Sequence, residues 1–340
     1  MKALIKKAFF WSLYSLGIVI FFVCTAEFVL RVFNPLGSDY IYEARRYFKI
    51  MSRDQRYSYI HTPGVEDQFQ GVHVRINSEG FRGKDFSVQK PPDTYRIVLL
   101  GDSVVFSWGV AEEQSLAVQL EKILETELDN TDLKIEVLPI GVGSWNTRTQ
   151  YEFMVERGIN YQPDLLVWII VANDLEPKSR GRTSIPLEEL REKPAELQLG
   201  RWEAATEELR RWIADYSHFW AVIERYRRLD YMRRLNQFYV ATGSLQAVDA
   251  RDATLQLASL LQAENIPIYA FIHGEQESKF GRAYHQLYGS FLDEANIAHF
   301  TFPEEVYDRK HVNSIIDPHQ NGRGLAITAR SIYESMGTLR

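Results

Sequence analysis

The segment Arg96-Ile-Val-Leu-Leu-Gly-Asp-Ser-Val-Val-Phe106 decides the fold of this chain. Residues 97–100 form a continuous apolar run, which is typical of a short strand buried on both faces of a sheet. Gly101-Asp102-Ser103 interrupts the run, and an amphipathic helical pattern follows over residues 115–128. Ser103 therefore stands where a buried strand ends, at the edge of an α/β sheet where ligands usually bind. It is the first candidate nucleophile, although Gly-Asp-Ser is also ordinary turn chemistry.

The remainder of the chain repeats this alternation of strand and helix. Short apolar runs predict strands, and amphipathic stretches between them predict helices. Such alternation indicates a parallel sheet with helices on both faces. The predicted fold is a three-layer α/β/α, flavodoxin-like sheet of about five strands, with an N-terminal transmembrane helix and a helical insertion. The further strands are expected at 135–138, 164–171, 268–272 and 297–300, and the helices at 147–157, 245–264, 282–294 and from about 325 onward.

Composition excludes several classes of function. The chain has 340 residues, of which 45% are hydrophobic, so it can bury a globular core. A net charge of -6 gives no case for nucleic-acid binding. Cys24 is the single cysteine, so neither an internal disulfide nor a thiolate metal site can form. The sequence has no His/Asp/Glu cluster with metal-ligand spacing and no Gly-rich phosphate loop, so we expect no metal and no cofactor.

Residues 8–26 carry no charge and are just long enough to span a bilayer as a helix. Lys2, Lys6 and Lys7 precede them, which predicts a single-pass anchor in the inner membrane with the rest of the chain on the periplasmic side. A cleaved signal peptide and a buried core helix are the alternatives. Because the apolar pattern continues to Phe33, we expect an uncleaved anchor.

The predicted organisation has three parts: a cytoplasmic tip and anchor at 1–33, an N-terminal extension at 34–94, and a catalytic domain at 95–340. That domain carries an insertion at 176–243, which is rich in charge and in Trp, Tyr and Arg. One interpretation of the insertion is a helix packed on the core with a solvated arginine face. The other is a lid over the site or an aromatic helix near lipid headgroups. Its apolar residues at roughly helical spacing are Trp202, Leu209, Trp212, Phe219, Trp220, Ile223 and Leu229.

Groups suited to acyl transfer follow several of the predicted strands. Ser103 follows the first, Gly143-Ser144 the second and Asn173 the third, while Asp317 and His319 lie in the last loop. Because parallel strands end at one edge of the sheet, these groups can converge. Nucleophilic catalysis requires such a Ser, His and Asp arrangement, and backbone N–H groups with the Asn173 amide can bind an oxyanion.

In these blocks the chain resembles the SGNH, or GDSL-like, hydrolases over residues 77–340, apart from the insertion. The matching blocks are Gly101-Asp102-Ser103, Gly141-x-Gly143-Ser144, Val171-Ala172-Asn173-Asp174 and Asp317-Pro318-His319. The stretch Asn-Ser-Glu-Gly-Phe-Arg-Gly at 77–83, together with the anchor, looks like a membrane-tethered bacterial branch. The chain has no Gly-x-Ser-x-Gly around Ser103, which argues against the α/β-hydrolase nucleophile elbow.

The resemblance implies a role for each block. Ser103 would be the nucleophile, with His319 as its base and Asp317 orienting that base. The oxyanion hole would use the N–H of Ser103, the side chain of Asn173 and one N–H of the second block. The family's oxyanion glycine falls on Ser144 in the preferred register, with Gly143 one place earlier, so both remain candidates.

Two other histidines compete for a role. Asp308-Arg-Lys-His311 fits the Asp-x-x-His spacing, but 317/319 is preferred because Asn321 and Gly324 follow and lead into an apolar helix. His311 is otherwise read as a surface-loop histidine. His273 follows a predicted strand at the functional edge and is a candidate substrate contact, whereas His61 and His285 look exposed.

Three hypotheses follow for function. The leading one is a membrane-anchored serine esterase outside the cytoplasm, acting on an ester such as an O-acetyl group on a carbohydrate. The second is an O-acyltransferase for a cell-envelope or secreted polysaccharide. The third is a non-catalytic module that binds or scaffolds glycans. The sequence does not indicate an oligomeric state.

Overall fold

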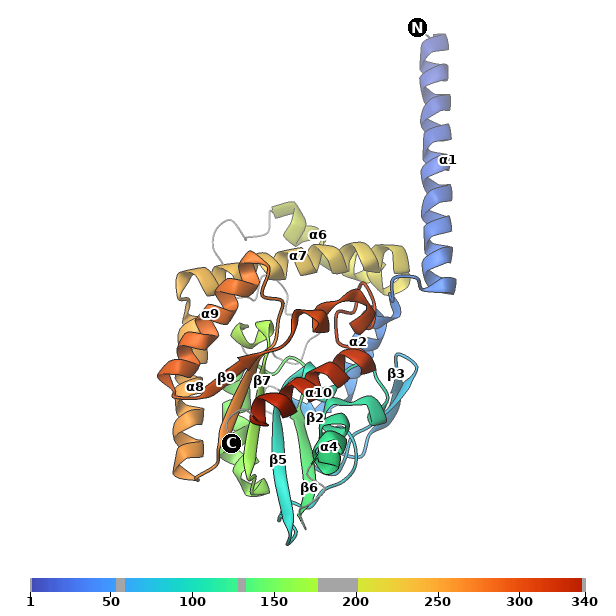
Figure 1. Cartoon of the computed structure of the whole chain (residues 1–340). Coiled ribbons are helices and arrows are strands. Elements are labelled where there is room, and N and C mark those ends of the chain that lie inside the picture. Colours follow the sequence, from blue (N-terminus) through green and yellow to red (C-terminus); the bar gives the residue numbers. More distant parts are fainter. Residues whose placement is uncertain (1, 53–58, 128–132, 177–200, 338–340) are drawn as a thin grey trace.

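The central sheet has the predicted parallel, flavodoxin-like order. The computed structural model describes residues 2–52, 59–127, 133–176 and 201–337, and Figure 1 shows the sheet at the centre of the domain. All neighbouring strands in it pair in parallel. The predicted fold class is confirmed. Across the sheet the strands are β6 (Lys134–Gly141), β5 (Thr94–Gly101), β7 (Leu165–Ile170), β8 (Ile268–Ile272) and β9 (Ala298–Thr301).

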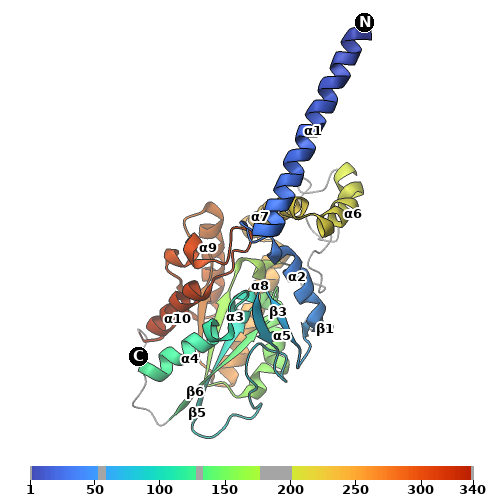
Figure 2. The ribbon, with the colours of Figure 1, turned by 90° about the vertical axis from the view of Figure 1, so that its right-hand side faces the viewer.

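Helices cover both faces of this sheet, as Figure 2 shows from the side. Strand β5 contributes Ile97 and Leu99 to one core and Val98 and Leu100 to the other. The continuous apolar run thus reflects burial on both faces. Helices α4 (Leu116–Glu127) and α10 (Gly322–Gly337) pack into the first core, whereas α5 (Thr147–Glu156), α8 (Leu245–Ala263) and α9 (Lys279–Glu294) pack into the second.

The chain passes from β5 to β6 on one side and then crosses to β7 on the other side of β5, so the direction in which strands are added reverses here. The polar blocks meet at this point of the sheet. Gly101 ends β5, and a Cβ there would lie 2.7 Å from the Val105 side chain and 3.0 Å from the Ile169 carbonyl oxygen. Only glycine allows this close approach of β5 to its neighbours. The short helix α3 (Ser103–Phe106) begins immediately afterwards.

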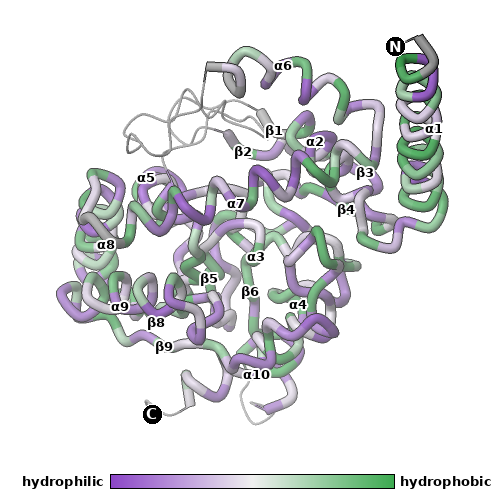
Figure 3. The backbone as a smooth tube through the Cα atoms, turned by 90° about the horizontal axis from the view of Figure 1, so that it is seen from above, coloured by the Kyte–Doolittle hydropathy of each residue, from purple (hydrophilic) through white to green (hydrophobic). Residues whose placement is uncertain are grey.

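Helix α1 (Lys2–Phe33) projects from the domain in Figures 1 and 2. Among the described residues it is the one helix long and apolar enough to cross a membrane, and only 6% of its most apolar window is buried. Figure 3 draws it mostly in apolar colours. Helix α2 (Asp39–Ile50) follows, and then two small antiparallel pairs, β1 (Met51–Ser52) with β2 (Ile60–His61) and β3 (Glu66–Phe69) with β4 (Val72–Arg75).

The described part of the predicted insertion consists of α6 (Arg201–Tyr216) and α7 (His218–Thr242), and residues 177–200 of that prediction lie outside the described chain. Helix α7 buries Tyr231, Leu235 and Tyr239 in the core, as the core-packed interpretation expects. That interpretation is wrong for α6, because Trp202 and Trp212 are 82% and 60% exposed. The short 3-10 helices are η1 (Glu112–Gln114), η2 (Gly158–Tyr161), η3 (Ala172–Leu175), η5 (Glu304–Tyr307) and η6 (Arg309–His311).

Candidate active site

Ser103, His319 and Asp317 form a continuous chain of hydrogen-bonding groups. The Ser103 hydroxyl lies 3.0 Å from Nε2 of His319, and Nδ1 of the same ring lies 2.5 Å from Oδ1 of Asp317. Ser103 stands more than two hundred positions before Asp317 and His319 in the sequence, and the edge of the sheet brings it to them. This is the geometry of a nucleophile, its base and the group that orients the base.

The Asp317 carboxylate is fully buried, and both of its oxygens accept hydrogen bonds. Its Oδ2 accepts hydrogen bonds from Nε2 of Gln70 at 3.0 Å and Nδ2 of Asn313 at 3.1 Å. Burial alone would raise the pKa of this carboxyl, but the charge of His319 and hydrogen bonds from His319 and Gln70 outweigh it. The pKa of Asp317 therefore lies below its ordinary value of 3.8, and the group is an anion at neutral pH.

Two aromatic rings lie beside the imidazole of His319. Tyr40 of α2 lies 5.8 Å from it between ring centroids, and Trp108 lies 6.4 Å away. The guanidinium of Arg225, from α7, lies over the Tyr40 ring at 5.1 Å. Helix α2 thus contacts the triad through Tyr40, and α7 packs on Tyr40 through Arg225. Neither residue was found from the sequence, because neither stands in a recognisable motif.

Asp102 organises the nucleophile and the third block together. Its Oδ1 caps α3 by accepting the N–H of Val104 at 3.0 Å, and its Oδ2 accepts from Nδ2 of Asn173 at 3.0 Å. The Ser103 hydroxyl also lies 3.2 Å from that Oδ2. One hydrogen of the Asn173 amide is thereby fixed, and the other is available to an acceptor beside Ser103.

The second block forms a tight turn in which Trp145 donates its N–H to the carbonyl of Val142 at 3.1 Å. Gly143 donates its own N–H to the Tyr47 hydroxyl at 3.1 Å. Ser144, the third residue of the turn, has φ +65° and is exposed, and its N–H has no acceptor among the residues that the structure describes. A positive φ at this turn position favours glycine.

Tyr47 connects this turn to His61. The Tyr47 hydroxyl lies 2.7 Å from Nε2 of His61, and Nδ1 of His61 lies 2.8 Å from the carbonyl oxygen of Gly80. The consistent pattern has His61 neutral, donating through Nδ1 and accepting through Nε2. The prediction that His61 is exposed is wrong, because the side chain is fully buried. Burial lowers the pKa of His61 to about 4.

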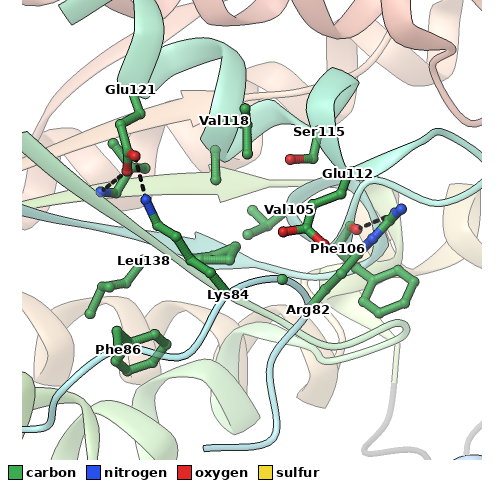
Figure 4. Close-up of a pocket in the computed structure, with 14 residues that line it drawn as sticks. Arg82, Lys84, Phe86, Val105, Phe106, Glu112, Ser115, Val118, Glu121 and Leu138 are labelled. Atoms are coloured by element: carbon green, nitrogen blue, oxygen red, sulfur yellow. Dashed lines mark hydrogen bonds and ion pairs between the residues drawn. The ribbon is translucent and has the colours of Figure 1, made fainter. Parts of the chain in front are cut away.

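Arg82, from the Asn-Ser-Glu-Gly-Phe-Arg-Gly stretch, braces the segment that follows the nucleophile. It is 3% exposed and donates to the backbone carbonyls of Phe106, Ser107 and Val110. Figure 4 shows its guanidinium beside Phe106, at a pocket of about 30 Å³. That volume holds about one water molecule, so we assign no ligand to this pocket.

A larger cavity of about 250 Å³ lies where the second and third blocks end. It is close to Asn173 in the chain, because Asp174 and Glu176 line it. Burial raises the pKa of Glu176 to about 7. Six of its nine lining residues are polar or charged, and the nine are Asn146, Arg148, Asp174, Leu175, Glu176, Leu245, Gln246, Asp249 and Ala250.

The remaining histidine predictions have mixed outcomes. The rival residue His311 is buried, contrary to the surface reading, and its Nδ1 lies 2.5 Å from the carbonyl oxygen of Glu305 rather than near Ser103. His285 is half-buried and lies 2.8 Å from the Gly274 carbonyl, so its expected exposure is also wrong.

His273 packs edge-on against Phe302 and Tyr307, with centroid distances of 5.7 Å and 5.1 Å. Burial, followed by the nearby charge of His319, lowers the pKa of His273 to about 4. The ring therefore belongs to the packing around the base, and a substrate contact by His273 stays a prediction.

The chain is similar to known proteins in its structure. No protein-family model matches the chain, and no curated protein matches it in sequence. Among solved structures, it is similar to TesA with a TM-score of 0.45 and 12% identity, over 72% of this chain and 99% of that one. It is similar to esterase EstA from Pseudoalteromonas sp., inhibited by monoethylphosphonate, with a TM-score of 0.44 and 11% identity over 72% and 97%. It is also similar to AlinE4, an SGNH-hydrolase family esterase, with a TM-score of 0.40 and 15% identity over 74% and 98%.

Proposed function

We propose that this chain is a serine esterase of the SGNH type. The observation that carries the proposal is the contact of Ser103 with His319 and of His319 with the buried, anionic Asp317. A nucleophile, a base and an orienting carboxylate in this order suit hydrolysis of an ester through an acyl-serine intermediate. A module that only binds glycans has no need of these contacts.

In the acylation step, the Ser103 oxygen attacks the ester carbonyl while Nε2 of His319 takes the hydroxyl proton. Asp317 accepts a hydrogen bond from the Nδ1–H of His319 and stabilises the resulting imidazolium. The tetrahedral oxyanion accepts hydrogen bonds from the N–H of Ser103 and Ser144 and from the Asn173 amide. Collapse of the intermediate breaks the bond to the alcohol, which leaves with the proton held by His319.

In the second step, His319 removes a proton from a water molecule, which attacks the acyl-Ser103 ester. The same donors bind the second oxyanion, and its collapse releases the acid and returns the proton to Ser103. Asp102 keeps Asn173 aligned through both steps, because it holds one amide hydrogen and leaves the other directed elsewhere.

We further propose an O-acetyl group on a carbohydrate as the substrate. The resemblance to the family implies an ester of this class, and the cavity of about 250 Å³ beside the third block has six polar or charged lining residues that could bind a hydroxyl-rich alcohol. Helix α1, with its lysines at one end and an uncharged stretch after them, would hold the domain on the periplasmic side of the inner membrane.

Transfer of the acyl group to a sugar hydroxyl is the second candidate. It is favoured by the rings of Tyr40 and Trp108 beside His319, since they leave only 21% of the histidine side chain exposed to bulk water. In this case a hydroxyl of the acceptor replaces water in the second step, and the remaining chemistry is unchanged. Release of acetate unaffected by added acetyl-acceptor oligosaccharides would count against transfer.

Covalent trapping tests the proposed nucleophile. The full chain, in mild detergent, is treated with a fluorophosphonate, which forms a stable adduct with an activated serine. We expect one adduct, mapped by peptide mass spectrometry to Ser103 and absent from Ser103→Ala. Labelling of another serine, or no labelling of a folded protein, would overturn the proposal.

A further inference from the structure

Helix α6 carries its apolar side chains on the outside. Trp202, Leu209, Trp212 and Tyr216 are 82%, 56%, 60% and 69% exposed. Their spacing of seven, three and four residues places all four on one face of the helix. Three of the four are aromatic residues with a polar atom, and the Trp212 and Tyr216 rings lie 5.3 Å apart. A helix on the surface of a soluble domain would expose its opposite face.

The inward face of α6 is charged. The side chains of Glu207 and Arg210 are only 12% and 15% exposed, and Arg210 forms an ion pair with Glu224 of α7 at 3.3 Å. At the end of the helix Asp215 pairs with Arg45 of α2. The Arg210–Glu224 pair is largely buried, whereas two tryptophans of the same helix are exposed. This is the reverse of the arrangement expected for a helix that faces water, and the outer face of α6 is suited to a less polar medium.

The end of α6 is attached directly to α1. Nη2 of Arg31 donates to the carbonyl oxygen of Tyr216 at 2.8 Å. Four residues earlier, the Glu27 carboxylate accepts from the N–H groups of His218 and Phe219, at 3.1 Å and 2.9 Å, at the start of α7. These contacts fix α6 at the level of residues 27–31, just after the uncharged stretch 8–26. Figures 1 and 2 show α6 on the side of the domain toward which α1 projects.

We propose that α6 lies in the interfacial layer of the membrane that α1 crosses, with its aromatic face toward the lipid. The inference rests on the proposed role of α1 as an anchor. Tryptophan and tyrosine favour the headgroup region, because their rings are apolar and their N–H and O–H groups reach polar partners. A helix lying in that layer buries one apolar face and keeps its charged face toward the protein and water.

This placement holds the candidate active site close to the membrane surface. Leu30 of α1 packs with Val222 of α7 and with Ile316, the residue before Asp317. Helix α7 lies between α6 and the triad, since it pairs with α6 through Glu224 and reaches Tyr40 through Arg225. The ester would then be met about one helix diameter, about 10 Å, from the headgroup layer, as suits a substrate that is synthesised at, or attached to, the membrane.

Nitroxide labelling of the full chain in lipid nanodiscs tests the inference. In a Cys24→Ala background, single labels are placed by Trp212→Cys, Phe21→Cys and Val155→Cys. Phe21 is 65% exposed on α1 and reports the anchor. Val155 is 52% exposed near the end of α5, which begins at the site edge and runs away from it, and serves as the aqueous control. Collisions with oxygen report lipid, and collisions with a water-soluble nickel chelate report water.

We expect the labels at 212 and 21 to collide with nickel about tenfold less than the label at 155, and more with oxygen. If position 21 is in lipid and position 212 is as accessible to nickel as position 155, the anchor stands and the placement of α6 is wrong. If position 21 is itself accessible to nickel, the anchor is wrong and the inference falls with it. Because Trp212 is exposed, its replacement removes no core packing.

Discussion

Gly143 donates its backbone N–H to the Tyr47 hydroxyl over 3.1 Å, and a Cβ on Gly143 would lie 3.2 Å from the same ring. The two residues belong to the second block and to the helix after the anchor. This contact occupies one of the two N–H groups that the sequence offers for the oxyanion hole. It therefore leaves Ser144 as the donor that we propose for the second block.

Tyr47→Phe should weaken both folding and catalysis. The change leaves the Gly143 N–H buried without an acceptor, which we expect to lower the free energy of unfolding by about 1–3 kcal/mol. A displaced turn would also lower kcat about ten- to a hundredfold. Denaturant unfolding and ester hydrolysis measure the two effects. Tyr284→Phe is the matched control, because the buried Tyr284 hydroxyl has no partner among the described residues; equal losses in both variants would contradict the account.

The oxyanion donors should respond differently to alanine. Asn173→Ala removes a side-chain donor, and we expect kcat to fall about 10²–10³-fold with little change in KM. Ser144→Ala keeps the backbone N–H, so its kcat should stay within a fewfold of the parent. A large loss in Ser144→Ala would assign the role to its hydroxyl instead. Ser144→Gly should stabilise the fold by up to about 1 kcal/mol, because φ +65° suits glycine.

Arg82→Met should destabilise the fold strongly. It leaves the carbonyls of Phe106, Ser107 and Val110 buried without their common donor, which we expect to lower the free energy of unfolding by about 3 kcal/mol or more. Arg148→Met is the control, since Arg148 pairs with the half-exposed Asp249 at the surface. That change should lower stability by less than about 1 kcal/mol. Similar losses for both variants would refute the bracing role of Arg82.

The contribution of His61 to stability should fall as the pH drops below neutrality. The pKa of His61 is about 4 in the fold, against an ordinary value of 6.5. Above pH 6.5 the histidine is neutral in both states and its contribution is complete. Between pH 6.5 and 4 only the unfolded chain gains the proton, so this residue lowers the free energy of unfolding by up to about 3 kcal/mol.

His61→Gln should remove part of that dependence, measured as denaturation midpoints from pH 7 to 4. His273, whose pKa is also about 4, should cause a similar loss of stability in the same pH range, and that loss should remain in His61→Gln. A glutamine at His73, which is 55% exposed, should leave the whole dependence in place. An unchanged pH dependence in His61→Gln would show that another group causes it. Asp317 affects stability at lower pH. Its pKa is below the ordinary value in the fold, so its contribution to stability is present above pH 3.8 and is lost as the pH falls further.

The fold could be predicted because its signals are local. Residues 97–100 are buried on both faces, and β8 covers the same residues, 268–272, as its apolar run. The triad candidates could be chosen because strand ends converge at one edge in any parallel sheet. The spacing that favours Asp308 and His311 is equally local, and only the tertiary structure separates that pair from Ser103.

The supporting residues could not be predicted, because their roles depend on distant partners. His61 looks like a surface histidine until Tyr47 and the Gly80 carbonyl enclose it. The arginine of the 77–83 stretch has a visible motif but no visible partner in the sequence. The pattern of α6 shows an amphipathic helix without showing which face turns inward. The partner of Arg210, Glu224, stands on another helix, and this ion pair helps to turn the charged face of α6 inward.

The most direct test of the central claim is hydrolysis of p-nitrophenyl acetate by the full chain in mild detergent. The parent is compared with Ser103→Ala, His319→Ala and His311→Gln. We expect the first two variants to lose about 10³-fold or more in kcat/KM, while His311→Gln stays within a fewfold of the parent. Full turnover by Ser103→Ala, or an active His319→Ala beside an inactive but folded His311→Gln, would contradict the account.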